Sequence, residues 1–343
     1  GVTGGRGGEG DFFVVSSGAP GGAGGATPGA NGENGGANAT AGGGGGGGAH
    51  GLVSATLPTF AVQGGHGGAG GSPSFMGFVM GGGGGGGGSG AVVTGTGDLE
   101  TLTVTVTGGN GGAGGSGGPS GVSGSGGGGG HGLVFSAAGG ATATIAANVS
   151  GGSGGGMLVA GGNGIVGANL DLDLYATVSG GVFGGGVDQR SAALRFTGGN
   201  SRLTLGSGWG LAGGIDVTGT LTFDQPTDAT LGETISGSGG IVKAGAGTLT
   251  LTGTNSYSGG SRLEAGLLQI GNAAALGSGG LVMSGGALRS TVTATLANAL
   301  TWEGGESSSI LSAAAGQTLT FTGPLAVFNT TGAPASLRFG SAT

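Results

Sequence analysis

The sequence predicts an all-β protein built as a β-solenoid, on the evidence of glycine-rich repeats, strand-like alternation and the absence of helical periodicity. Of the 343 residues, 103 are Gly and only 7% are charged, which is outside the usual composition of a globular enzyme. Apolar and polar residues alternate clearly over residues 102–106 and 170–174, as they do in a half-buried strand. Apolar stripes of period 3.6 with helix caps do not occur. Full disorder is disfavoured because 36% of the residues are hydrophobic and the net charge is only -7.

The first half of the chain repeats itself. A short apolar step followed by paired glycines starts at Val2, Val62, Val106 and Val149, at intervals of about 60, 44 and 43 residues. Polyglycine runs at 42–48, 81–88 and 126–130 each precede a strand-like segment, which begins near His50, Ser89 and His131. Since these runs have no side chains to bury, any order in them must come from backbone hydrogen bonds. We therefore favour ordered, closely packed glycine segments over loose loops, although flexible spacers remain the alternative.

The composition divides the chain into a glycine-rich repeat region, residues 1–186, and a second region, residues 187–343. In the second region short alternating segments are separated by Gly, Asn and Ser turns. The segments lie at 203–205, 221–223, 248–251, 267–270 and 318–321. This pattern alone is also compatible with an antiparallel sandwich or a barrel.

One stretch decides between these folds. Residues 239–270 contain Ile241-Val242-Lys243, then Gly247-Thr248-Leu249-Thr250-Leu251, then the turn Asn255-Ser256-Tyr257-Ser258-Gly259-Gly260, and finally Gly266-Leu267-Leu268-Gln269-Ile270. This order closely resembles the passenger-associated transport repeat of bacterial autotransporters, with a small departure at Ile241. The resemblance implies a right-handed parallel β-helix passenger that a C-terminal β-barrel exports through the outer membrane; the barrel itself is not expected within this chain.

The same stretch predicts which side chains face inward. Leu249 and Leu251 should enter an apolar column, while Thr248, Thr250 and Thr252 face outward. Asn255, Gly259 and Gly260 should occupy the corners at which the chain turns. Stacked rungs would satisfy the backbone along the solenoid axis.

A search for chemistry predicts no catalytic, cofactor-binding or metal site. Cysteine is absent, and His50, His66 and His131 each lie beside glycine, as expected for polar residues that cap a glycine run or are exposed at a turn. The pairs Asp171/Asp173 and Asp98/Glu100 are interpreted as solvated strand faces rather than glycosidase or calcium sites. The Gly-x-Ser-x-Gly matches around Ser116 and Ser153 are expected by chance in so much glycine. The chain is therefore expected not to be an enzyme, although some pectate-lyase-like enzymes share the β-helix.

Charge limits the partners. Lys243 and seven Arg give a pI near 4.7, which argues against nucleic acid, and no apolar run is long enough to span a bilayer as a helix. The resemblance implies an extracellular or outer-membrane-surface adhesin or structural passenger. Its expected partners are host or bacterial surfaces, glycans or further copies of itself. The alternatives are a passive stalk that promotes export of an effector domain, and an ice- or glycan-binding module using Thr101, Thr103 and Thr105.

Overall fold

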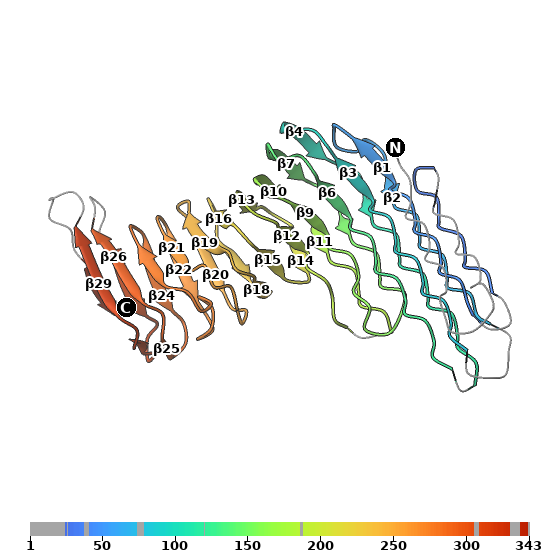
Figure 1. Cartoon of the computed structure of the whole chain (residues 1–343). Helices are drawn as coiled ribbons and strands as arrows, with labels where there is room; N and C mark the ends of the chain where they lie inside the picture. The colour runs from blue at the N-terminus through green and yellow to red at the C-terminus, as the bar shows by residue number, and fades with distance from the viewer. Residues whose placement is uncertain are drawn as a thin grey trace. The chain divides into compact units, whose positions relative to one another are not determined.

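The structure is a computed structural model that describes residues 25, 27–37, 41–73, 79–119, 121–185, 188–304, 309–329 and 337–341. Its regular elements are β-strands, and the paired strands run parallel in stacked sheets. Among the described residues no helix is long and apolar enough to cross a membrane. The prediction of an all-β parallel β-helix is confirmed (Figure 1). An antiparallel sandwich is excluded.

The backbone contacts divide the chain into two compact units. The first, here called the glycine-arm unit, contains residues 1–167, 176–195 and 210–214; the second, called the β-helix unit, contains residues 168–175, 196–209 and 215–343. The boundary that composition predicts, between 186 and 187, lies outside the described residues, as does the first glycine repeat at Val2. The division into 1–186 and 187–343 therefore stays a prediction.

In the glycine-arm unit the strands are short. They are β1 (Leu52–Ser54), β2 (Val62–Gln63), β3 (Ala91–Val93), β4 (Gly97–Leu102), β5 (Val106–Thr107), β6 (Leu133–Phe135), β7 (Ala141–Ile145), β8 (Val149–Ser150), β9 (Ile165–Gly167), β11 (Thr177–Ser179) and β14 (Gly210–Ala212). Within this unit they stack in the orders β1-β3-β6-β9, β4-β7 and β2-β5-β8-β11-β14. Strand β12 (Leu194–Phe196) has residues in both units.

The β-helix unit holds the remaining strands. They are β10 (Leu170–Leu174), β13 (Asn200–Leu205), β15 (Ile215–Val217), β16 (Thr220–Asp224), β17 (Ala229–Leu231), β18 (Ile235–Ser236), β19 (Gly240–Ala244), β20 (Thr248–Leu251), β21 (Ser261–Leu263), β22 (Leu267–Ile270), β23 (Leu281–Met283), β24 (Ala287–Ser290), β25 (Ala294–Leu296), β26 (Leu300–Gly304), β27 (Ser309–Ala313), β28 (Leu319–Phe321), β29 (Leu325–Asn329) and β30 (Leu337–Ser341). The largest stack of this unit runs β10-β13-β16-β19-β21-β23-β26-β29, and a second runs β17-β20-β22-β24-β27-β30.

Inward-facing side chains of the β-helix unit form apolar columns along these stacks. Leu249 pairs with Ala229 on one side and with Leu268 on the other, and it has no exposed surface. Along β20 the burial alternates strictly, with Leu249 and Leu251 buried and Thr248 and Thr250 partly exposed. The predicted inward and outward assignment is therefore confirmed. Each fully buried leucine contributes about 1.5–3 kcal/mol of hydrophobic stabilisation.

The transport-repeat turn is also anchored inside the β-helix. Asn255 is buried at its corner and joins three rungs, because its Oδ1 accepts the backbone N–H of Ile235 at 2.8 Å and its Nδ2 donates to the carbonyl oxygen of Ala275 at 2.7 Å. Tyr257 is fully buried, and its hydroxyl lies 2.6 Å from the Ser261 hydroxyl. Gly260 has a φ of +87°, a backbone conformation that residues other than glycine rarely adopt.

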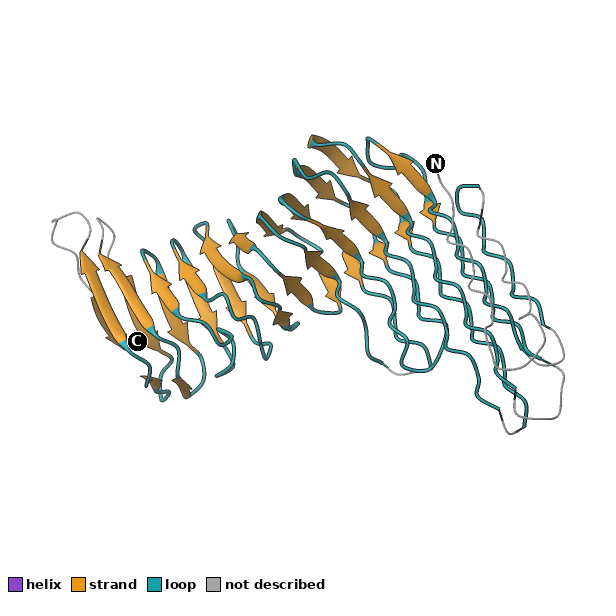
Figure 2. Cartoon of the chain, viewed as in Figure 1, coloured by secondary structure: helices purple, strands orange, loops and turns teal. Residues whose placement is uncertain are grey.

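The glycine-rich segments of the first unit are ordered as paired arms. After β2, β5 and β8 the chain leaves the strands through outgoing arms (64–72, 108–116 and 151–155), and it comes back to β1, β3, β6 and β9 through return arms (42–49, 80–88, 124–130 and 159–163). Figure 2 shows these arms as long paired segments that extend from the short strands. They are extended but belong to no sheet.

Hydrogen bonds between arms repeat every three residues. In the return arm 80–88, the N–H groups of Gly84 and Gly87 donate to the carbonyl oxygens of Ser125 and Gly128 in the next return arm, and Gly81 donates to Val122 just before that arm. The N–H groups of Gly82, Gly85 and Gly88 donate to the carbonyl oxygens of Gly71, Gly68 and Gly65 in an outgoing arm. The carbonyl oxygens of Gly83 and Gly86 accept from Gly45 and Gly48. A period of three is that of the polyproline II conformation, which has no internal hydrogen bonds and must be paired from outside.

Space, rather than backbone conformation, requires glycine in the arms. None of the described glycines in 81–88 has a positive φ. A Cβ at Gly84 would overlap the carbonyl oxygen of Gly112, and one at Gly85 would overlap that of Gly46. At Gly83 and Gly86 the nearest atom would be 3.6 Å away, an ordinary contact. Two positions in three are therefore closed to any side chain by neighbouring backbone.

Three expected features of the glycine-arm unit are wrong in detail. The alternation over 102–106 predicts one strand, but β4 ends at Leu102 and β5 begins at Val106. Glu100 has a φ of +66°, and the register of β4 against β7 shifts between Asp98 and Thr101. Because of this irregularity Asp98 and Glu100 do not lie as alternate residues on one strand face. Thr103 and Thr105 lie between β4 and β5, so they do not continue a flat strand row from Thr101.

Candidate functional surfaces

Polar side chains follow the outer positions of the arms and bond to backbone of the next rung. The side chain belongs to the residue at the position that follows the paired glycines. Its acceptor atom receives a hydrogen bond from the backbone N–H of the equivalent residue in the next rung. Asn31 Oδ1 accepts from His66 N at 2.7 Å, His66 Nδ1 from Asn110 N at 2.8 Å, and Asn110 Oδ1 from Ser153 N at 2.8 Å. These contacts form a continuous column, here called the acceptor ladder, which satisfies N–H groups that the lattice of arms leaves outward.

His50 and His131 make the same contact at the ends of return arms. His50 Nδ1 accepts from Ser89 N at 3.1 Å, and His131 Nδ1 accepts from Asn163 N at 2.9 Å. Burial lowers the pKa of both imidazoles, and Arg195 lowers that of His131 further by charge repulsion. His50 and His131 thus make equivalent contacts in successive repeats, and each imidazole caps a backbone N–H group. Within the described ranges no group of three or more His, Asp or Glu side chains gathers where a metal ion could bind.

The serines of the Gly-x-Ser-x-Gly matches lie in the arms. The backbone N–H of Ser116 donates to the Ser72 hydroxyl at 2.9 Å, and that of Ser153 donates to Asn110. Both serines thus belong to the hydrogen-bonded surface of an outgoing arm and not to a strand-to-helix elbow, which a hydrolase nucleophile of this motif requires.

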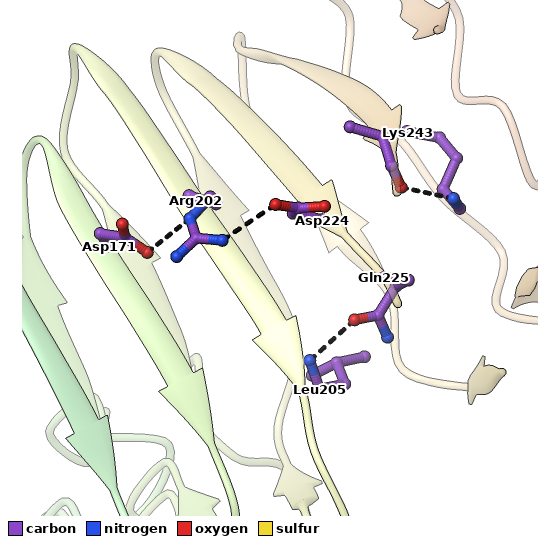
Figure 3. A network of polar contacts seen from close by, with 7 residues as sticks. Asp171, Arg202, Leu205, Asp224, Gln225 and Lys243 are labelled. Carbon is purple, nitrogen blue, oxygen red and sulfur yellow. Dashed lines mark hydrogen bonds and ion pairs between the residues drawn. The ribbon is translucent and has the colours of Figure 1, made fainter. Parts of the chain in front are cut away.

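The outward face of the long stack in the β-helix unit carries a row of ion pairs. Arg202 on β13 donates from Nε to Asp171 of β10 at 2.7 Å and from Nη1 to Asp224 of β16 at 2.9 Å (Figure 3). The bond to Asp171 is the main cause of a raised pKa for the Arg202 guanidinium. Asp171 is thus the partner of an arginine on the neighbouring strand, and no basic residue beside the Asp171/Asp173 pair was expected from the sequence.

A second arginine on the same stack repeats this arrangement. Arg262 on β21 donates to Glu264 at 3.0 Å and to Glu303 of β26 at 2.8 Å. Each of these two guanidinium groups is shared by two carboxylates and is about 38–39% exposed, so the face resembles a stabilised strand surface more than a site with an available acid or base.

Lys243 is a buried charged residue whose burial was not predicted from the sequence. It occupies an inward position between Phe223 and Leu263 and has no exposed surface. Its Nζ donates to the carbonyl oxygens of Ala244, Gly245 and Ala265, the bond to Gly245 being 2.8 Å long. Desolvation is the main cause of its lowered pKa, opposed by the charges of Asp224 and Asp228. Lys243 therefore links two successive corners by donating hydrogen bonds to carbonyl groups of both.

The β-helix and the transport-repeat stretch together point to one class of protein, the autotransporter passenger. The family model of the passenger-associated-transport-repeat matches residues 241–270, which in the structure are β19 to β22 with their buried Lys243, Asn255 and Tyr257. The chain therefore contains a passenger-associated transport repeat, and this repeat supports its assignment as an autotransporter passenger.

A curated relative supports the same class. The chain is 37% identical over 105 residues to "Adhesin BmaC autotransporter" of Brucella suis biovar 1 (strain 1330), and the match covers 30% of this chain and 3% of that relative. The chain therefore spans a small part of the length of the curated relative that it matches. The comparison with solved structures found no significant match.

Proposed function

We propose that this passenger acts on the bacterial surface or after secretion as an adhesin or structural component that mediates adhesion, aggregation or matrix formation. The observation that carries the proposal is the transport repeat at 241–270, folded as rungs of a β-helix, together with likeness to a relative whose name is that of an adhesin. Host or bacterial surfaces, glycans or further copies of the passenger are the proposed partners, and a C-terminal translocator barrel is the proposed export partner.

The proposal includes the absence of enzymatic activity. This part of the proposal is supported because histidines and arginines of the kind that a catalytic site would need already make structural hydrogen bonds and ion pairs. The three histidines accept backbone N–H groups, and Arg202 and Arg262 are each shared by two carboxylates. A general acid or base needs a titratable group within reach of a substrate proton, and these groups are occupied by the fold.

Display of the chain on bacteria that lack other adhesins tests the proposed role. We expect displaying cells to settle faster, or to bind host cells and coated surfaces more, than cells that display an unrelated β-helix at the same density. Equal settling and equal binding would contradict adhesion and aggregation alike. A panel of polysaccharide and glycoside substrates incubated with the purified chain tests the enzymatic alternative, and release of reducing sugar would overturn that part of the proposal.

A passive, export-promoting stalk is the second candidate function, because the family whose model matches is named for transport of the passenger. It predicts that removal of 241–270 lowers the amount of a fused effector at the cell surface. The adhesin role predicts instead that adhesion per displayed molecule depends on this chain. Quantifying surface amount and adhesion separately distinguishes the two.

A further inference from the structure

The acceptor contacts of the three histidines share one requirement. In each contact the donor is a backbone N–H of the next rung, from Ser89, Asn110 or Asn163, at 2.8–3.1 Å from Nδ1. A backbone N–H can only donate, so Nδ1 must be the unprotonated nitrogen of a neutral imidazole. A protonated imidazole donates from both nitrogens and cannot make this bond.

The acceptor ladder contains its own comparison. Asn31 and Asn110 hold the same ladder position as His66 and accept the same kind of N–H at 2.7–2.8 Å, but through an amide oxygen. An amide does not titrate at physiological pH, whereas the imidazole is the side chain that does. The ladder therefore alternates between an amide acceptor, which has no basic nitrogen, and an imidazole acceptor, whose Nδ1 lone pair must stay free.

The surroundings of His50 and His131 oppose protonation of their imidazoles. Burial disfavours the imidazolium at His50 and His131, and Arg195 adds a positive charge near His131, so the pKa of each is held below the ordinary value of 6.5. The described segment that packs against the arm of His66, residues 27–36, carries one charged residue, Glu33. At the end of β2, just before the arm of His66, Gln63 Nε2 lies 3.4 Å from His66 Nε2.

We propose that His50, His66 and His131 make the glycine-arm lattice acid-sensitive, each releasing its backbone N–H from the next rung when its imidazole gains a proton. The direction follows from linkage. A base that is harder to protonate in the folded state leaves stability intact above the ordinary value of 6.5 and reduces it progressively as the pH falls below that value. The contacts join successive rungs, so their loss loosens the arms relative to one another, while the apolar columns of the β-helix unit contain no histidine.

The test replaces the histidines by the residue that the ladder already uses. A triple variant, His50→Asn, His66→Asn and His131→Asn, keeps an acceptor at each position and removes the titration. We expect the melting temperature of the wild-type glycine-arm unit to fall by roughly 5 °C more than that of the variant when the pH is lowered from about 7.5 to about 5. Acid effects on carboxylates are common to both proteins and cancel in the comparison.

Equal melting-temperature losses in the two proteins would overturn the proposal. The single variant His66→Asn, at a position whose two ladder neighbours are Asn31 and Asn110, keeps the test valid if the triple variant does not fold. Hydrogen exchange gives a second measurement in the wild type, because protection of the Ser89, Asn110 and Asn163 amides, corrected for the intrinsic effect of pH, should fall together in acid. Unchanged protection at all three amides would likewise contradict it.

Discussion

The two units stack successive rungs by parallel hydrogen bonds, but they fill the space between chains in opposite ways. In the β-helix unit, side chains such as Leu249, Leu251 and Leu268 fill the interior as continuous columns. In the arms, backbone meets backbone, and a carbonyl oxygen occupies the place that a Cβ would take at Gly84 or Gly85. Hydrophobic burial stabilises the first arrangement, and the second depends on hydrogen bonds worth about 1 kcal/mol each. In the arms, repeated backbone hydrogen bonds between closely packed segments can therefore take the place of an apolar core, provided that nearly every buried residue there is glycine.

The largest expected effect tests the apolar side of this comparison. Leu249→Asp should lower the free energy of unfolding of the β-helix unit by about 4 kcal/mol, because it places an unpaired carboxylate in a column with no exposed surface. Thr250→Asp, on the outward face of the same strand, should cost less than about 1 kcal/mol. Chemical denaturation measures both. Equal losses of unfolding free energy in the two variants would contradict the assignment of Leu249 to the inward face and Thr250 to the outward face of β20.

The next effect tests the glycine side. The double variant Gly84→Val and Gly85→Val should destabilise the glycine-arm unit by about 3 kcal/mol or more, since both side chains overlap backbone carbonyl groups that cannot rotate away. The matched double variant Gly83→Val and Gly86→Val places each Cβ 3.6 Å from its nearest atom, an ordinary contact, and should change stability by less than about 1 kcal/mol. Thermal denaturation compares them. If both pairs are tolerated equally, the arms are not packed as described.

Lys243→Met tests a polar exception within the apolar columns. The variant removes a donor shared by three carbonyl groups and should cost about 2 kcal/mol at neutral pH. Because desolvation lowers the pKa of Lys243 on folding, the free energy of unfolding of the wild type should rise as the pH approaches 10.5 from below. Denaturation curves across this range should show that rise, relative to the variant. A wild type and variant with parallel pH profiles would disprove the assigned burial of the ammonium group.

The smallest effect concerns the ion-pair row. Arg202→Met should cost less than about 1 kcal/mol, since its guanidinium and both carboxylates are 35–39% exposed. Added salt should reduce even this difference, because partly exposed charges are screened. A loss of several kcal/mol that persists in molar salt would show that the row is a central support of the β-helix unit.

Much of the β-helix could be predicted from sequence because its pattern is local. Alternation in 248–251 is enough to place Leu249 inside, and Asn255 with Gly260 marks a turn within one rung. The environment of Lys243 could not be predicted this way, since the acceptors that make its burial tolerable include Ala265 of the following rung. Arg202 was missed beside Asp171 for the same reason: 31 residues separate them along the chain, and only the register of β10 with β13 makes them neighbours.

The arms show the opposite limit of sequence reasoning. The polyglycine run at 81–88 indicates that the packing excludes side chains there. It does not identify which positions are closed, because all eight residues are identical. Only the three-residue period of the hydrogen bonds separates Gly83 and Gly86 from their neighbours. The break between Leu102 and Val106 was likewise hidden, since the alternation of residue types continues through a segment whose backbone does not remain a strand.

The three-residue hydrogen-bond period also governs how arm length can change during evolution. Inserting or deleting three residues in an arm such as 108–116 adds or removes one complete turn, so every remaining N–H keeps its partner type and every side chain keeps its direction. A change of one or two residues would rotate the outer positions, including that of Asn110, into the closed interior. Reading-frame-preserving codon changes therefore do not suffice here: viable length variants of these arms should differ by multiples of three amino acids, that is, of nine nucleotides.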